Sequence, residues 1–146
     1  RENSTMSRMG LPDYVVTMRK PGEIEERVTH GDDLPVLMWQ KYASPIWDDI
    51  NQSRTLNKMP ARDDKDQKHM CPLQLDVIER CIHLWTNPGD TIFSPFTGIG
   101  SEGYCAVKMG RKFIGTELKP QYYELACQNI GDAQKEQGGL FAELVA

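Results

Sequence analysis

The stretch TIFSPFTGIGSEGYCAVKMGRKFIGTE, residues 91–117, decides the expected fold. Residues 91–94 predict a β-strand, and a glycine-rich turn follows them. Residues 101–109 predict a helix that ends at Gly110, because glycine readily adopts the left-handed conformation found just after helices. Residues 112–117 predict a second strand. Strand, turn, helix and strand in this order are typical of neighbouring parallel strands in an α/β sheet.

Two further helices are expected on either side of this stretch. Leu75, Ile78, Ile82 and Trp85 recur at helical spacing within residues 72–85, which indicates one apolar stripe of an amphipathic helix. Residues 120 to about 130 predict a helix whose first residue is proline, a residue type suited to the first turn. The expected fold class is therefore α/β, with half of an open parallel sheet after an irregular region.

The turn contains a GxGxxG motif made by Gly98, Gly100 and Gly103, and Glu117 ends the next expected strand. Glycines let the backbone turn sharply and approach a ligand closely, and a carboxylate at the tip of the second strand can accept both hydroxyls of a ribose. This arrangement predicts a nucleotide site. The alternative is a tight strand-to-helix turn followed by a surface glutamate.

Length and charge favour one adenosine-containing ligand over another. Only residues 118–146 follow Glu117, too few for the second mononucleotide-binding half of a dinucleotide fold. Glu102, in the first turn of the expected helix, would also repel a pyrophosphate at that helix end. S-adenosylmethionine has the ribose and lacks phosphate, so the sequence favours S-adenosylmethionine over NAD.

The composition of the 146-residue chain is that of one domain or of part of one, with 39% hydrophobic and 26% charged residues. No apolar run approaches the ~20 residues of a membrane-spanning helix, and the N-terminus lacks the pattern of a signal peptide, so we expect a cytoplasmic location without a membrane partner. The net charge of −4 weakens any simple electrostatic argument for nucleic-acid binding.

The four cysteines and the histidines do not recur at metal-ligand spacings, so no metal site is expected. The cysteines are predicted to be free and mostly buried; they are Cys71, Cys81, Cys105 and Cys127.

The first half of the chain is less regular. Residues 14–18 are rich in β-branched side chains and predict a strand, closed by a turn at residues 20–22. Residues 34–39 and 43–47 place two tryptophans among turn residues, which predicts local packing around loops. Residues 57–68 carry both signs of charge without apolar periodicity and indicate an exposed linker.

Three segments carry a resemblance to a known family. They are KHMCPL at 68–73, SPFTGIGS at 94–101 and FIGTE at 113–117, the last followed by Tyr122. Together they resemble the C-terminal half of an amino-directed DNA methyltransferase of a bacterium or bacteriophage, in the order of the permuted β class. That family methylates adenine N6 or cytosine N4. The resemblance is good over residues 68–130 and looser over 13–57.

The resemblance implies a partial Rossmann-like methyltransferase sheet that uses S-adenosylmethionine. It also implies four regions: the end of a catalytic half at 1–30, a target-recognition region and linker at 31–68, a cofactor-binding half at 69–135 and a C-terminal tail at 136–146. The implied substrate is double-stranded DNA, bound by the complete enzyme.

The implied cofactor-binding residues lie in the three segments and next to them. They are His69, Met70, Pro72, Leu73, Ser94, Pro95, Phe96, Thr97, Gly98, Gly100, Ser101, Glu117, Leu118 and Tyr122. For His69, a capping or surface role is the alternative. Basic side chains interleaved with aromatic and polar ones suit phosphate contacts and are the candidate DNA-binding residues, although a solvated loop has the same composition. They are Lys41, Arg54, Lys58 and Arg62.

The chain departs from the family pattern at three places. Ser94 stands where the family usually has aspartate, and the segment Met70-Cys71-Pro72 keeps a proline but lacks the usual lysine before it. The catalytic loop of the family contains a Pro-Pro dipeptide, and none occurs in this sequence. The nearest pattern, at residues 44–47, is interpreted as packing. No catalytic residue is therefore assigned, and we expect the chain to be inactive alone and to pair with a missing N-terminal half or a second copy.

Two other functions stay open from the sequence. One is an S-adenosylmethionine-dependent methyltransferase for RNA or protein. The other is a noncatalytic adenosine-binding module that acts through partner association. The target base, the DNA sequence recognised and the oligomeric state are not determined by these residues.

Overall fold

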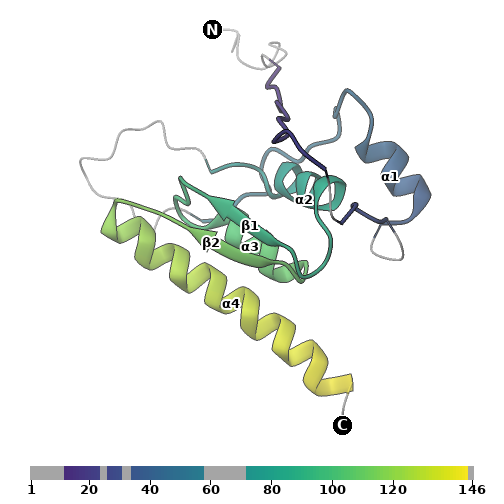
Figure 1. Cartoon of the computed structure of the whole chain (residues 1–146). Helices are drawn as coiled ribbons and strands as arrows, with labels where there is room; N and C mark the ends of the chain where they lie inside the picture. The colour runs from purple at the N-terminus through teal and green to yellow at the C-terminus, as the bar shows by residue number, and fades with distance from the viewer. Residues whose placement is uncertain (1–11, 24–25, 31–33, 58–71, 145–146) are drawn as a thin grey trace, which may run out of the picture.

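The computed structural model describes residues 12–23, 26–30, 34–57 and 72–144 (Figure 1). The elements are α1 (Val36–Tyr42), α2 (Leu75–Trp85), β1 (Thr91–Ser94), α3 (Ser101–Lys108), β2 (Lys112–Gly115) and α4 (Pro120–Leu144). The predicted order of helix, strand, turn, helix, strand and helix after residue 72 is confirmed. His69, Met70, Lys58 and Arg62 lie outside the described residues.

The two strands form a parallel pair, as the sequence predicts. In the register, Ile92 lies opposite Phe113, and Phe93 lies opposite Ile114. Because side chains alternate across a strand, these two pairs point to opposite faces of the sheet. The first pair packs into the core, whereas Phe93 and Ile114 are 61% and 57% exposed. One face of the sheet is therefore covered and the other presents apolar side chains to solvent.

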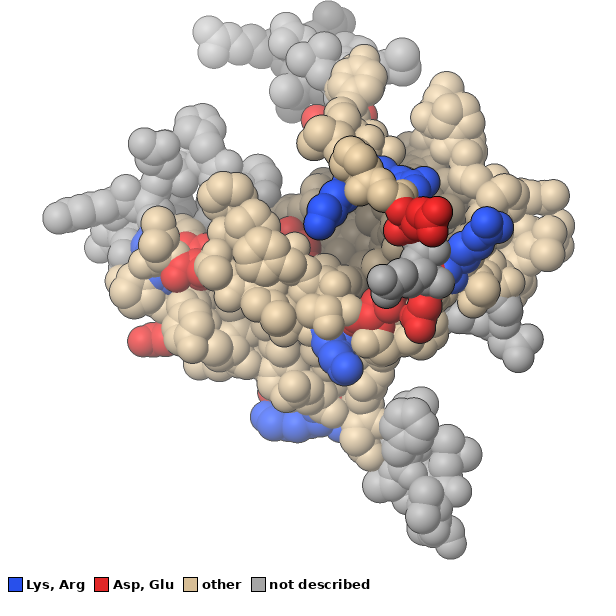
Figure 2. Space-filling view, viewed as in Figure 1, with Lys and Arg blue, Asp and Glu red and all other residues tan. Residues whose placement is uncertain are grey.

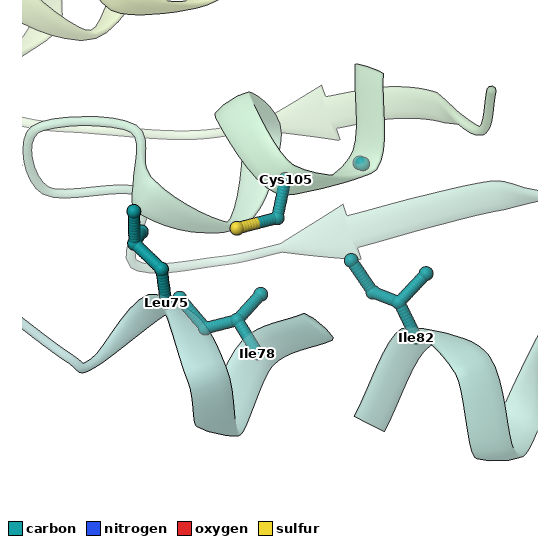
Figure 3. Close-up of a cluster of buried hydrophobic side chains, with 5 residues drawn as sticks. Leu75, Ile78, Ile82 and Cys105 are labelled. Atoms are coloured by element: carbon teal, nitrogen blue, oxygen red, sulfur yellow. The ribbon is translucent and has the colours of Figure 1, made fainter. Parts of the chain in front are cut away.

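The core lies between α2, α3 and the covered face of the sheet. Figure 3 shows Leu75, Ile78 and Ile82 projecting from α2 toward Cys105 on α3. These are three of the four apolar positions that the helical spacing predicted for residues 72–85; the fourth, Trp85 at the end of α2, is 46% exposed. Burial of apolar surface stabilises the fold by about 25 cal/mol per Å² removed from water. The apolar side chains of α2 therefore hold this helix against α3.

Gly110 ends α3 as expected. It has a φ of +74°, and the backbone N–H of Arg111 donates to the carbonyl of Ala106 at 2.8 Å. The N–H of Gly110 donates to the carbonyl of Val107 at 3.0 Å. These two bonds form the Schellman arrangement, which reverses the chain and delivers it directly into β2.

Two predictions in the N-terminal half are wrong. Residues 14–18 do not form a strand; Tyr14, Val16 and Met18 are exposed, and a β-branched run needs a neighbouring strand to pair with. Residues 36–42, expected as loop, form α1, in which Trp39 N–H donates to Pro35 at 2.9 Å. This helix was missed because it is only seven residues long and begins with four consecutive apolar residues, which show no stripe.

The C-terminal helix is longer than predicted. It runs from Pro120 to Leu144 and includes residues 136–144, which were expected to form a tail. Glycines weaken the helical signal in this part of the sequence. Packing on α3 compensates, since Lys108 pairs with Glu136 at 2.9 Å and Gln137 donates to the carbonyl of Lys108 at 3.3 Å.

The described cysteines are free, as predicted, but they are not all buried: Cys105 is buried, Cys81 is half-buried and Cys127 is exposed. None of the helices in the described part of the chain is both long and apolar enough to span a membrane.

Candidate functional site

Two loops meet at the carboxyl ends of the parallel strands, the usual place for ligands in such sheets. The first, residues 95–100, follows β1, and the second, residues 116–119, follows β2. The backbone N–H of Thr116 donates to the carbonyl of Ser94, and the N–H of Thr97 donates to the carbonyl of Thr116, both at 3.0 Å. The hydrogen bonding of the sheet therefore continues into the loops and holds them side by side.

The Glu117 carboxylate joins the two loops. Its Oε2 accepts a hydrogen bond from the backbone N–H of Gly98 at 2.8 Å, and its Oε1 accepts one from the N–H of Lys119 at 2.9 Å. Each carboxylate oxygen has a second lone pair, so two additional hydroxyl donors can be accepted. A half-buried carboxylate fixed in this way is suited to a vicinal diol such as that of ribose.

The three motif glycines have different structural roles. A Cβ at Gly98, whose φ is +55°, would meet no atom within 4 Å, so this backbone is open to a ligand. A Cβ at Gly100 would lie 3.0 Å from Ala126 of α4, and one at Gly103 would lie 2.5 Å from Ile130. Two of the three glycines therefore allow α4 to pack closely, and the space for a ligand is at Gly98.

The apex of the glycine turn is anchored to α4. Ile99 is buried and packs with Leu125, and the side-chain amide of Asn129 donates to the Ile99 carbonyl at 2.8 Å. Sequence reasoning missed Asn129. Its spacing of three and four residues from Ala126 and Leu125, which places it on the same helix face, was the available signal.

The remaining predicted site residues of the loops differ in exposure. Ser94, Thr97 and Ser101 are buried. Phe96 and Leu118, by contrast, are 86% and 99% exposed, one in each loop. An exposed apolar side chain on each loop offers contact area for the flat face of an aromatic ligand.

The start of α3 is poorly suited to a phosphate. Glu102 lies in the first turn, where its carboxylate competes with any anion for the positive end of the helix. Burial raises the pKa of this carboxyl above its ordinary value. In its ionised form, Glu102 disfavours a pyrophosphate at the position where dinucleotide folds bind one.

The other predicted cofactor residues lie farther along the chain. Tyr122 packs against the cluster around Ile99, and the Lys119 ammonium lies 4.2 Å from the centre of its ring. Pro72 and Leu73 precede α2, and among the described residues they form no hydrogen bond with the two loops.

The described candidates for DNA contact pair with carboxylates. Lys41 Nζ lies 2.5 Å from Asp49, and the Arg54 guanidinium bonds to Asp76 and to Glu79, with one contact of 2.6 Å. These carboxylates raise the pKa of Arg54. On the face seen in Figure 2, basic and acidic side chains of the described residues are interspersed. Arg54 therefore takes part in holding the middle segment on α2, whereas Lys41 pairs with Asp49 inside that segment.

A buried arginine completes this attachment. Arg80 of α2 is 6% exposed, and its guanidinium lies 5.0 Å from the centre of the Tyr42 ring and 5.4 Å from that of Trp47. It also donates to Asp49 at 2.8 Å. Trp47 in turn donates to the Tyr42 carbonyl at 2.8 Å. Trp47 therefore packs on α2, as the interpretation of residues 44–47 as packing predicts.

No group of side chains within the described residues could hold a metal ion. The arrangement at the loops instead offers carboxylate oxygens that can accept hydroxyl groups, apolar contact and an open backbone.

Comparisons with known proteins agree with this description. The sequence model of a DNA methylase family, for N6 and N4 methylation, matches residues 17–128. The chain is 30% identical over 118 residues to the type II methyltransferase M1.MboII of Moraxella bovis, spanning 75% of this chain and 45% of that protein. It is 36% identical over 62 residues to M.XycI of Xanthomonas campestris pv. cyanopsidis, spanning 42% of this chain and 21% of that protein.

A solved structure has a similar fold. The protein TTHA0409 of Thermus thermophilus, crystallised with S-adenosyl-L-methionine, superposes with a TM-score of 0.58 at 25% identity, covering 80% of this chain and 41% of that one. This chain thus spans less than half the length of these matched proteins.

Proposed function

Because this chain belongs to the DNA methylase family, we propose that it is the S-adenosylmethionine-binding and DNA-recognition portion of a site-specific DNA methyltransferase. The methyl group would go to an exocyclic amino nitrogen, N6 of adenine or N4 of cytosine. One observation carries the proposal: the Glu117 carboxylate, fixed by Gly98 and Lys119, stands beside backbone that is open to a ligand.

S-adenosylmethionine suits the groups at the two loops. Glu117 would accept the ribose hydroxyls, the open backbone at Gly98 would let the nucleoside approach, and Phe96 with Leu118 would supply apolar contact to adenine. When bound, the cofactor supplies an electrophilic methyl group on sulfur. Glu102 in the first turn of α3 disfavours a pyrophosphate, which argues against NAD in this site.

The other predicted contacts are part of the same proposal. The cofactor pocket would be lined by Ser94, Pro95 and Thr97 at the end of β1 and in the loop after it. Ser101 would face the cofactor from the start of α3. Tyr122, Pro72 and Leu73, with His69 and Met70, would complete the pocket from the neighbouring segments.

We assign the chemistry to the rest of the enzyme. The sequence holds no Pro-Pro dipeptide of the kind that activates the target amino group in the resembled family. The matched relatives have more than half of their length outside the region that this chain spans. Parallel sheets are normally covered on both faces, so the exposed Phe93 and Ile114 are the proposed contact surface for that remaining half.

DNA recognition would lie in the segment before the sheet. The ion pairs of Arg54 with Asp76 and of Asp49 with Arg80 attach residues 36–54 to α2, next to the cofactor half. A base extruded from duplex DNA would then meet the cofactor in a pocket shared by this segment and the catalytic half. The regions 1–30 and 31–68 and the start of the cofactor half at residue 69 are proposals of the same kind, and the helix α4 continues past residue 135 to Leu144.

The test is transfer of a tritiated methyl group from S-adenosylmethionine to duplex DNA by the product of the complete gene, followed by mass spectrometry of the nucleosides. The proposal predicts N6-methyladenine or N4-methylcytosine. Methylation of RNA or protein in place of DNA, or binding of cofactor without transfer to any of the three, would contradict it and support one of the two alternative functions.

A further inference from the structure

The side chain of Thr116 joins the two loops through a hydrogen bond that nothing in the sequence indicated. Its hydroxyl donates to the carbonyl of Pro95 at 2.8 Å. Its backbone N–H also donates to the carbonyl of Ser94 at the end of β1, and its carbonyl accepts from the N–H of Thr97 in the loop. Thr116 thus contacts Ser94, Pro95 and Thr97, on either side of Phe96.

The neighbouring residues leave little freedom on the inner side of this loop. Thr97 is buried, and its hydroxyl lies where a Cβ on Gly115 would be, at 2.1 Å from that ideal position. Only glycine at the end of β2 allows this approach. Pro95 and Phe96 are exposed, so little side-chain packing holds them. Their placement therefore depends on the few hydrogen bonds made by the backbone of this loop.

The hydrogen bond accepted by the Pro95 carbonyl is the one that lies next to Phe96. Proline lacks an N–H, so residue 95 can be fixed through its backbone only by its carbonyl. Among the described residues, the hydroxyl of Thr116 is the donor to that carbonyl. Removing the hydroxyl would free the peptide between Pro95 and Phe96 while leaving the sheet bonds of Thr116 intact.

We propose that Thr116 is a positioning residue for the ligand: its hydroxyl holds the loop that carries Phe96 at a fixed distance from Glu117 and Leu118. The inference rests on the proposed function, since it concerns the same site. Holding the loop in the bound arrangement lowers the entropic cost of binding. Thr116 acts through Pro95 and Phe96 and is not itself assigned a contact with the cofactor.

The experiment compares Thr116→Val with Thr116→Ser by calorimetric titration of the chain with S-adenosylmethionine. Valine keeps the branched shape and removes the donor, so affinity should fall about fivefold, the worth of one neutral hydrogen bond. Serine keeps the hydroxyl and should restore the affinity of the unsubstituted chain. Thr29→Val is the matched control, because its hydroxyl contacts Asn87 at 3.5 Å, away from the loops.

The melting temperature of each variant without ligand separates positioning from general stability. We expect melting temperatures within about a degree of one another, and a loss of affinity in Thr116→Val alone. Equal affinities for Thr116→Val and the unsubstituted chain, or no rescue by Thr116→Ser, would refute the inference and leave the proposed function standing. Failure of the unsubstituted chain to bind S-adenosylmethionine would refute the proposed function and the inference together.

Discussion

Glu117 and Gly98, nineteen residues apart in the sequence, are joined by a 2.8 Å hydrogen bond from the glycine N–H to the glutamate Oε2. The bond connects the turn after β1 to the loop after β2. It fixes the carboxylate before any ligand arrives, and therefore reduces the ordering that binding requires.

Replacing Glu117 by alanine should weaken S-adenosylmethionine binding by at least about tenfold, because hydrogen bonds to a charged group are worth about 1.5–3 kcal/mol each. The titration is calorimetric, and Glu124→Ala on the exposed part of α4 is the matched control. An unchanged dissociation constant in Glu117→Ala would remove Glu117 from the site.

The packing role of Gly103 can be separated from glycine's helix propensity. A Cβ at Gly103 would lie 2.5 Å from Ile130 and 2.8 Å from Phe113, so Gly103→Ala should destabilise the fold by about 1–3 kcal/mol through overpacking. Gly131→Ala is the control, since a Cβ there meets nothing within 4 Å and should stabilise α4 by up to about 1 kcal/mol. Urea denaturation of both variants measures the difference; equal and favourable effects would show that α3 and α4 are not packed this way.

Stability should depend on Asp49 in acid. Hydrogen bonds from Lys41 and then Arg80 lower the pKa of Asp49 from 3.8 to about 2. A carboxyl whose pKa is lower in the folded state stabilises the fold above its unfolded pKa, and this contribution is lost as the pH falls through the folded value. The melting temperature of the chain should therefore fall between about pH 4 and pH 2.

Asp49→Asn provides the comparison. At pH 7 the variant should have a lower melting temperature, because buried Arg80 loses its carboxylate partner. The amide cannot titrate, so the melting temperature of the variant should fall less between pH 4 and pH 2. Parallel melting curves for the variant and the unsubstituted chain across this pH range would contradict the assignment.

The exposed face of the sheet predicts self-association of the isolated chain. Phe93 and Ile114 are opposed in the register and both more than half exposed, so two copies can bury these faces against each other. Light scattering should show mass rising with concentration, and Phe93→Thr combined with Ile114→Thr should suppress the rise. Met18→Thr, at an apolar side chain outside the sheet that is even more exposed, should leave the rise unchanged. A concentration-independent monomer would contradict the prediction.

The sequence predicted the second half of the chain well because its signals are local. Apolar spacing located α2, glycine at position 110 located the end of α3, and the motif with Glu117 located the two loops. Bonds made by common polar residues were not predictable, since Thr116 and Asn129 differ from other threonines and asparagines only in what lies opposite them in space.

In the first half, tertiary contacts decide the structure. Residues 14–18 have strand-forming side chains without a neighbouring strand to pair with among the described residues. Helix α1 is seven residues long and begins with a continuous apolar run, so it shows no stripe. Of the basic residues proposed for DNA contact, Arg54 pairs with Asp76 and Glu79, which are close to it only after α2 has formed. Lys41 pairs with Asp49 of its own segment.

The most direct test of the central claim is calorimetric titration of the unsubstituted chain with S-adenosylmethionine and, separately, with NAD. We predict one S-adenosylmethionine per chain and NAD binding at least about tenfold weaker, because Glu102 opposes a pyrophosphate at the start of α3. NAD binding as tight as S-adenosylmethionine, or tighter, would contradict the assignment of the cofactor.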